Sequence, residues 1–181
     1  MKRSLVRKPI FMIGLAVTAV ALAVGAYWFQ PWKLWVDETV HDKLPVAAAR
    51  SVPGASQDSA AALKTLATGT FISHEHSTKG TVKIIELADG SRTLRLEALD
   101  TSNGPDLRVW LTDAPVKEGV GGWRVFDNGA YVSLGKLKGN KGEQNYALPA
   151  DADLDKYSSV SIWCNRFDVS FGAAELSKVA A

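Results

Sequence analysis

An apolar run of twenty residues, IFMIGLAVTAVALAVGAYWF, constrains this chain more than any other feature of its sequence. The run spans residues 10–29 and contains no charged residue. A helix that rises about 1.5 Å per residue would extend it over roughly 30 Å, the thickness of a bilayer's hydrocarbon core. Four basic residues and no acidic residue precede it, and the positive-inside rule keeps such a flank in the cytoplasm. The sequence therefore predicts a cytoplasmic tail (residues 1–9), a transmembrane helix (residues 10–29) and an extracytoplasmic remainder.

A cleaved signal peptide is the alternative for the same run. Val24, Gly25 and Ala26 have the small-residue pattern of a cleavage site. Two features favour an uncleaved, single-pass anchor in the cell membrane. The run is longer than the usual apolar segment of a signal peptide, and aromatic residues crowd its far end, where their rings favour the membrane–water interface. Under both interpretations the folded domain lies outside the cytoplasm.

Residues 30–65 are interpreted as an extracytoplasmic tether. Pro, Ser, Ala and charged residues mix there without a sustained apolar period. Within the tether, residues 58–66 could form a short helix, with Ser56 or Asp58 as its cap.

The charge of the chain is unevenly distributed. Its formal net charge is +2, yet residues 1–33 hold five of the 21 Lys and Arg residues and no Asp or Glu. The rest of the chain therefore carries 16 basic residues against all 19 acidic ones. A nucleic-acid-binding protein places its positive charge on the folded domain, so this distribution argues against a nucleic-acid partner.

From residue 66 onward the sequence is typical of short strands. Leu94 and Leu96 alternate with polar neighbours, residues 107–112 alternate in the same way, and Asp89-Gly90 marks a hairpin turn. We expect strands at residues 70–73, 81–87, 93–99, 107–111, 123–126, 130–134, 144–148, 159–164 and 167–171. This pattern predicts an all-β fold over residues 66–177, an antiparallel β-sandwich of about eight short strands.

The scarcity of soft ligands limits the cofactors. A single cysteine excludes an intramolecular disulfide and a CxxC redox pair, and the absence of C-x-x-C-H excludes covalent c-type haem. A blue-copper site uses two histidines, a cysteine and usually an axial methionine, but Met1 and Met12 precede the domain and no histidine follows Cys164. No residue is assigned as a metal ligand. The cofactor is unknown, and a noncovalent haem and a metal ion both stay open as alternatives.

Four separated motifs resemble one known domain family. They are GTFISHEHSTKGTV at residues 69–82, TSNGPDL at 101–107, LGKLKGNKGEQNY at 134–146 and IWCNRFDVSFGAAEL at 162–176. In this order they closely resemble the DM-thirteen domain family, an electron-transfer domain, from about residue 66 to 177. The segment FQPWKLWVDETV at residues 29–40 also resembles the membrane-proximal part of actinobacterial-type, membrane-anchored members.

This resemblance implies a β-sandwich with a redox-active cysteine in the I-W-C segment, acting as a bare thiol or as a ligand to a prosthetic group such as haem. Here that residue is Cys164. It shares strand parity with Val160 and Ile162, so its sulfur should point toward the core. A position at a strand end would leave it partly accessible, and Arg166 could curl back to stabilise a thiolate. The alternative is a buried cysteine that acts as a small hydrophobic residue, and both interpretations stay open.

His74 and His76 are the candidate cofactor-binding partners of Cys164. They are two residues apart, so on a strand they share one face and could reach one ligand. Their polar neighbours favour the alternative of two exposed histidines near a strand end.

Two functions are consistent with the sequence. The first is a membrane-anchored redox module that transfers electrons to a redox or envelope protein partner through Cys164. The second is a non-catalytic binding or structural module of the cell envelope with an inert cysteine, and an exposed Trp110 or Trp163 would favour it. No Ser/His/Asp or paired-carboxylate arrangement indicates a hydrolase.

Overall fold

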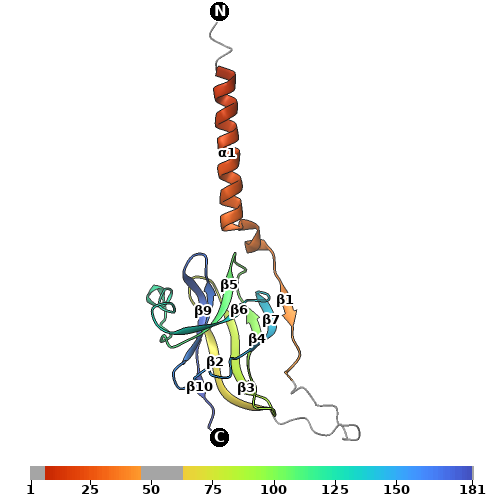
Figure 1. Cartoon of the computed structure of the whole chain (residues 1–181), viewed down its shortest axis with the longest axis vertical. Coiled ribbons are helices and arrows are strands. Elements are labelled where there is room, and N and C mark those ends of the chain that lie inside the picture. The colour runs from red at the N-terminus through yellow and green to blue at the C-terminus, as the bar shows by residue number, and fades with distance from the viewer. Residues whose placement is uncertain (1–6, 46–62, 181) are drawn as a thin grey trace, which may run out of the picture.

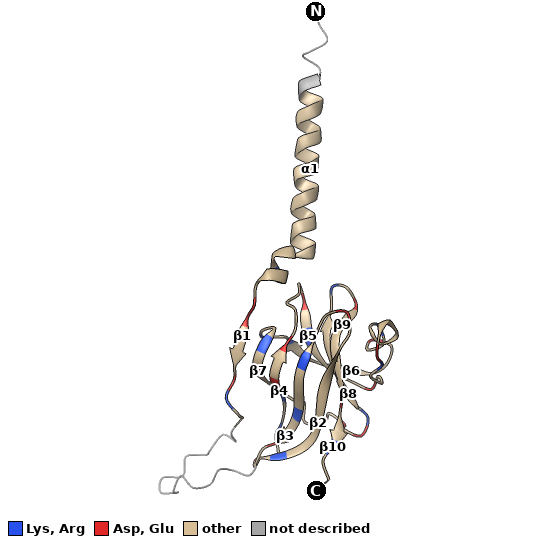
Figure 2. Cartoon of the chain, turned by 180° about the vertical axis from the view of Figure 1, so that it is seen from behind, with Lys and Arg blue, Asp and Glu red and all other residues tan. Residues whose placement is uncertain are grey.

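The structure, a computed structural model, describes residues 7–45 and 63–180. Helix α1 (Arg7–Phe29) projects away from a β-rich domain, and the short helix η1 (Pro31–Trp35) leads the chain toward the first strand (Figure 1). The stretch Pro9–Phe29 of α1 is long and apolar enough to cross a membrane, and none of it is buried against the domain. From Pro9 onward α1 carries no Lys, Arg, Asp or Glu, whereas the strands carry residues of both signs (Figure 2). The predicted apolar segment is thus a single helix that is exposed along most of its length.

Ten strands are present in the described residues. They are β1 (Thr39–His41), β2 (Lys64–Ser73), β3 (Lys79–Glu86), β4 (Arg92–Asp100), β5 (Leu107–Thr112), β6 (Tyr131–Lys136), β7 (Lys141–Ala147), β8 (Ser159–Cys164), β9 (Val169–Glu175) and β10 (Ser177–Lys178). The predicted all-β class is confirmed. The predicted count of about eight was low: eight of the nine expected ranges coincide with strands, and β1 and β10, which were not expected, are too short to leave a period in the sequence.

The strands form one curled sheet in the order β1-β7-β4-β3-β2-β9-β8-β5-β6, with β10 also on β2. Strand β2 joins the two halves, because its first part pairs with β3 and its last three residues pair with β9. All pairs are antiparallel except β1 with β7, which is parallel. The domain is therefore a curled mixed sheet that packs upon itself, rather than two separate antiparallel sheets.

The concave face of the sheet holds the main core. Side chains from both halves meet there, including Leu94 and Leu96 of β4, Val109 of β5 and Val160 of β8, each with no exposed surface. Burial of each such side chain contributes about 1.5–3 kcal/mol. The predicted alternation on β4 and β5 is confirmed, since these residues face inward.

A second, smaller core lies on the outer face of the β9-β8-β5-β6 half. It contains Trp110, Phe126, Trp163 and Ala173, and the loop between β5 and β6 covers it. The strand predicted at residues 123–126 is wrong, because these residues form turns of that loop. Phe126 is fully buried there, so its apolar character reflects packing of the loop onto the sheet.

Strand β2 begins earlier than predicted. The expected strand at residues 70–73 covers only its end, and the expected helix at residues 58–66 does not form where it is described, since Lys64–Leu66 belong to β2. The rest of that expected helix, residues 58–62, lies outside the described residues. The first half of β2 has little apolar alternation, and pairing with β3 and β10 supplies its hydrogen bonds. Tertiary context overrides local preference there.

The first part of the expected tether lies along the sheet. Strand β1 pairs with β7. The Asn140 side chain binds the segment just before β1: its oxygen accepts from the Glu38 amide at 2.7 Å, and its nitrogen donates to the Asp37 carboxylate at 2.8 Å. The Arg95 guanidinium donates to the Asp42 carbonyl at 3.1 Å. The residues that follow α1 are therefore fixed against the domain by polar contacts.

Candidate functional site

Cys164 is the last residue of β8 and lies inside the main core. Its side chain has no exposed surface, and it shares the core with Val160 and Ile162, which confirms the predicted parity. Its Cα is paired with Leu107 of β5 on one side and with Val169 of β9 on the other. The expected partial access at a strand end is not found, because strands on both sides and the core beneath cover the sulfur.

The surroundings of Cys164 favour the neutral thiol. Burial raises the pKa of the Cys164 thiol, and the negative charge of Asp106 raises it further, whereas the backbone amides of Arg166, Phe167 and Asp106 oppose this only in part. The expected stabilisation of a thiolate by the Arg166 guanidinium is also absent, since that group donates to the Trp28 carbonyl at 2.6 Å. We therefore expect thiol–disulfide exchange at Cys164 to be slow, because the thiolate is the reactive form.

The turn after Cys164 contacts the end of α1. The Phe167 ring stacks on Phe29 with centroids 5.6 Å apart, and the Arg166 guanidinium lies 5.2 Å from the centre of the Trp28 ring. Arg166 also donates to the Tyr27 carbonyl at 3.2 Å. The buried thiol is therefore at the end of the domain that faces the apolar helix, which we call the helix-proximal end.

His74 is a buried, neutral histidine of the outer core. Its Nε2 donates to the Lys117 carbonyl at 3.0 Å, which leaves Nδ1, 2.8 Å from the Ser170 hydroxyl, as the acceptor. Burial lowers the pKa of His74, and the hydrogen bond to Lys117 opposes this shift. The ring also packs on Phe126 at 5.7 Å. Both nitrogens are engaged within the protein, so His74 presents no free ligand atom.

His76 lies on the other side of the sheet. Its ring lies 3.9 Å from that of Phe171, a residue of the main core, and its Nε2 is 3.1 Å from the Glu75 carboxylate. Residues 74–76 form a bend beyond β2 and not a strand, so strand parity does not govern them. The structure separates His74 from His76 into different clusters, and only His76 is near the helix-proximal end.

The residues around Cys164 do not fit a prosthetic group on its sulfur. Cys164 does not border any of four cavities that described residues form. A haem ligated by this thiol would have to displace core side chains that are packed on it. Within residues 7–45 and 63–180, no group of three or more His, Cys, Asp or Glu side chains is placed to hold a metal ion.

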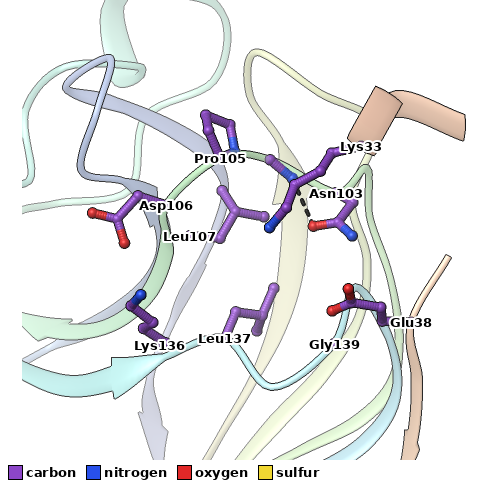
Figure 3. A pocket seen from close by; sticks show the side chains of 10 residues that line it. Lys33, Glu38, Asn103, Pro105, Asp106, Leu107, Lys136, Leu137 and Gly139 are labelled. Carbon is purple, nitrogen blue, oxygen red and sulfur yellow. Dashed lines mark hydrogen bonds between the residues drawn. The ribbon is translucent and has the colours of Figure 1, made fainter. Parts of the chain in front are cut away.

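Two of these cavities lie at the helix-proximal end. One, of about 370 Å³, is mostly apolar and lies between the segment Phe29–Leu34 and the side chains of His76, Phe167 and Phe171. The other, of about 70 Å³, is bordered by Lys33, Glu38, Asn103, Asp106 and Lys136 (Figure 3). In it the Asn103 oxygen accepts from the Gly104 amide at 2.8 Å, as the dashed line shows.

The sequence interpretation missed a row of aromatic rings on the outer face. Tyr131, Trp110 and Trp163, which we call the aromatic stack, come from the neighbouring strands β6, β5 and β8. Trp110 and Trp163 are 3% and 1% exposed, so neither is the exposed contact residue that would favour a binding module. A signal was present: both tryptophans alternate with core aliphatic residues on strands that therefore have two buried faces.

The fold and this arrangement define a β-domain with a buried thiol at the end next to an apolar helix. A family model described as electron transfer DM13 matches residues 70–176. Since this match covers more than half of the chain, the chain belongs to the DM13 family, and the predicted family is confirmed. Searches of curated proteins and of solved structures give no significant match.

Proposed function

We propose that this protein is a membrane-anchored electron-transfer domain in which Cys164 exchanges single electrons with a partner that does not touch it. The observation that carries this proposal is the position of Cys164. It is the one cysteine of a DM13 domain, it is fully buried, and the turn that follows it contacts the end of the apolar helix.

The topology follows from the helix and its flanks. We place α1 across the membrane as a single-pass anchor, with residues 1–9, four of which are basic, in the cytoplasm and the domain on the extracytoplasmic side of the cell membrane. Tyr27, Trp28 and Phe29 at the end of α1 suit the membrane–water interface. The helix-proximal end, with Cys164, then faces the membrane surface.

The burial of Cys164 decides the kind of chemistry. Thiol–disulfide exchange needs an accessible thiolate, and both burial and the raised pKa oppose it. One-electron transfer needs no contact, because an electron can tunnel through packed protein. In this step the thiol loses one electron to an oxidised partner and one proton to solvent, which leaves a thiyl radical. Return of an electron and a proton restores the thiol.

The test uses an oxidant that cannot reach the core. The full chain in detergent micelles is mixed in the dark with chemically prepared tris(bipyridine)ruthenium(III) in air, where oxygen traps the thiyl radical, and the surviving thiol is titrated after denaturation. The proposal expects Cys164 to be consumed, although a native maleimide reaction leaves it intact. Complete survival of the thiol at several equivalents of oxidant would overturn the proposal. The absorbance spectrum and metal content of the same sample test for haem or bound metal.

A non-catalytic envelope module with an inert cysteine is the second candidate. The specific observation in its favour is that Cys164 is 0% exposed within a packed apolar core, which is the ordinary environment of a structural cysteine. It predicts that the thiol survives the remote oxidation, and that Cys164→Ser changes only the stability of the domain.

A further inference from the structure

The rings of the aromatic stack are in close parallel contact. The Tyr131 and Trp110 rings lie 3.9 Å apart at 9°, and the Trp110 and Trp163 rings lie 4.8 Å apart at 21°. Both pairs are stacked, and the shorter centroid distance places the Tyr131 and Trp110 rings nearly face to face. This stacking brings the electron systems of three oxidisable side chains into contact.

The stack leads from the surface to the interior. Tyr131 is 44% exposed on β6, Trp110 is buried on the neighbouring β5, and Trp163 is buried on β8 beyond it. Trp163 immediately precedes Cys164, and on β8 the two side chains lie on opposite faces of the sheet, in the outer and the main core respectively. A single residue step therefore separates the inner end of the stack from the buried thiol.

The tryptophans have an uncommon polar environment. The indole Nε1 atoms of Trp110 and Trp163 are buried and have no hydrogen-bond partner in the structure. A buried indole N–H usually finds an acceptor. Without an acceptor, an oxidised indole keeps its proton, so an electron can move from ring to ring without a coupled proton transfer.

We propose that the aromatic stack is the electron path between the protein surface at Tyr131 and Cys164. This inference rests on the proposed electron-transfer function and assigns its docking point and its route. The chemistry suits such a path, because tyrosine, tryptophan and cysteine are the side chains that lose one electron most readily. The partner is a high-potential one-electron oxidant that docks over Tyr131.

The transfer balances in four steps. The oxidant takes one electron from Tyr131, whose phenolic proton passes to water. Trp110 then reduces the tyrosyl radical, which takes up a proton from water, and Trp163 reduces the Trp110 radical cation. Finally, the Cys164 thiol gives an electron to the Trp163 radical cation and loses its proton. In sum, the oxidant gains one electron, solvent gains one proton, the thiol becomes a thiyl radical and the three rings are unchanged.

The experiment repeats the remote oxidation with variants of the stack in the full chain. Tyr131→Phe keeps the stacked ring and removes only the oxidisable phenol, and Trp110→Phe removes the middle ring. The matched controls are Tyr157→Phe and Trp123→Phe, at partly buried positions outside the stack. Circular dichroism confirms that each variant is folded, and electron paramagnetic resonance of samples frozen after mixing with the oxidant reports the tyrosyl radical.

We expect the initial rate of thiol loss to fall severalfold or more in Tyr131→Phe and Trp110→Phe and to stay unchanged in both controls. The part of the tyrosyl signal that comes from Tyr131 should be lost in Tyr131→Phe and should persist longer in Trp110→Phe, because its reductant is missing. If all variants lose the thiol at the rate of the natural chain, the path is wrong and the redox role of Cys164 stands. If the natural chain keeps its thiol, the proposed function fails and the path fails with it. Should Trp110→Phe not fold, Tyr131→Phe decides the question.

Discussion

Cys164 in the native chain should react with a maleimide at least about three to four orders of magnitude more slowly than in the unfolded chain. The sulfur has no exposed surface, and β5 and β9 flank it on both sides. Its labelling therefore requires an opening that separates β8 from its neighbours and disrupts the main core. An opening of that size approaches global unfolding in its free energy.

The magnitude follows from that free energy. A domain of ordinary stability unfolds at a cost of at least about 5 kcal/mol, and each 1.4 kcal/mol or so reduces the open population tenfold. The raised pKa of the Cys164 thiol does not slow labelling of the open state, since the thiol regains its ordinary pKa once it is exposed. The opening equilibrium alone therefore sets the predicted factor.

The assay follows the mass of the intact chain in detergent micelles during maleimide labelling. An Ala150→Cys variant places a second thiol at an exposed position of the same chain and supplies an internal reference. The prediction is biphasic labelling, with a fast phase for the new cysteine and a slow phase for Cys164. Labelling of both thiols at similar rates would refute the reasoning and would show that the turn after β8 opens locally.

Three further predictions concern the folded domain. Burial lowers the pKa of His74 below 6.5. As the pH falls through about 6.5, the histidine is therefore protonated in the unfolded chain but stays neutral in the folded chain, and the free energy of unfolding decreases. His74→Gln should flatten this decrease, measured by urea titrations at several pH values. Burial raises the pKa of Tyr146 to about 12, so its ultraviolet titration should come well above the ordinary 10.0, and stability should fall between these values because the unfolded chain ionises first. Gly172→Ala would place a Cβ 2.5 Å from the Thr78 Cβ and should cost about 2 kcal/mol or more, whereas Gly121→Ala, with open space around it, should leave the urea midpoint nearly unchanged.

Local sequence patterns predicted much of the fold. The uncharged run of residues 10–29 is a helix, the alternation on β4 and β5 is oriented as expected, and β8 has the predicted bounds. The helix follows from the length of its uncharged apolar run, and the strands follow from the alternation of side chains along each element. The errors fall where that signal is weak, as in the first half of β2, or where apolar residues belong to a loop, as at Phe126.

The sequence by itself determined the apolar helix, the all-β class, the family and the inward direction of Cys164, because these depend on composition, motifs and the order of neighbouring residues. Only the tertiary structure decided that the thiol is sealed, that His74 and His76 enter different clusters, and that Tyr131 stacks on Trp110 and Trp163. A strand's period specifies which face a side chain takes. What covers that face depends on strands and loops from distant parts of the chain, whose pairing no local pattern records.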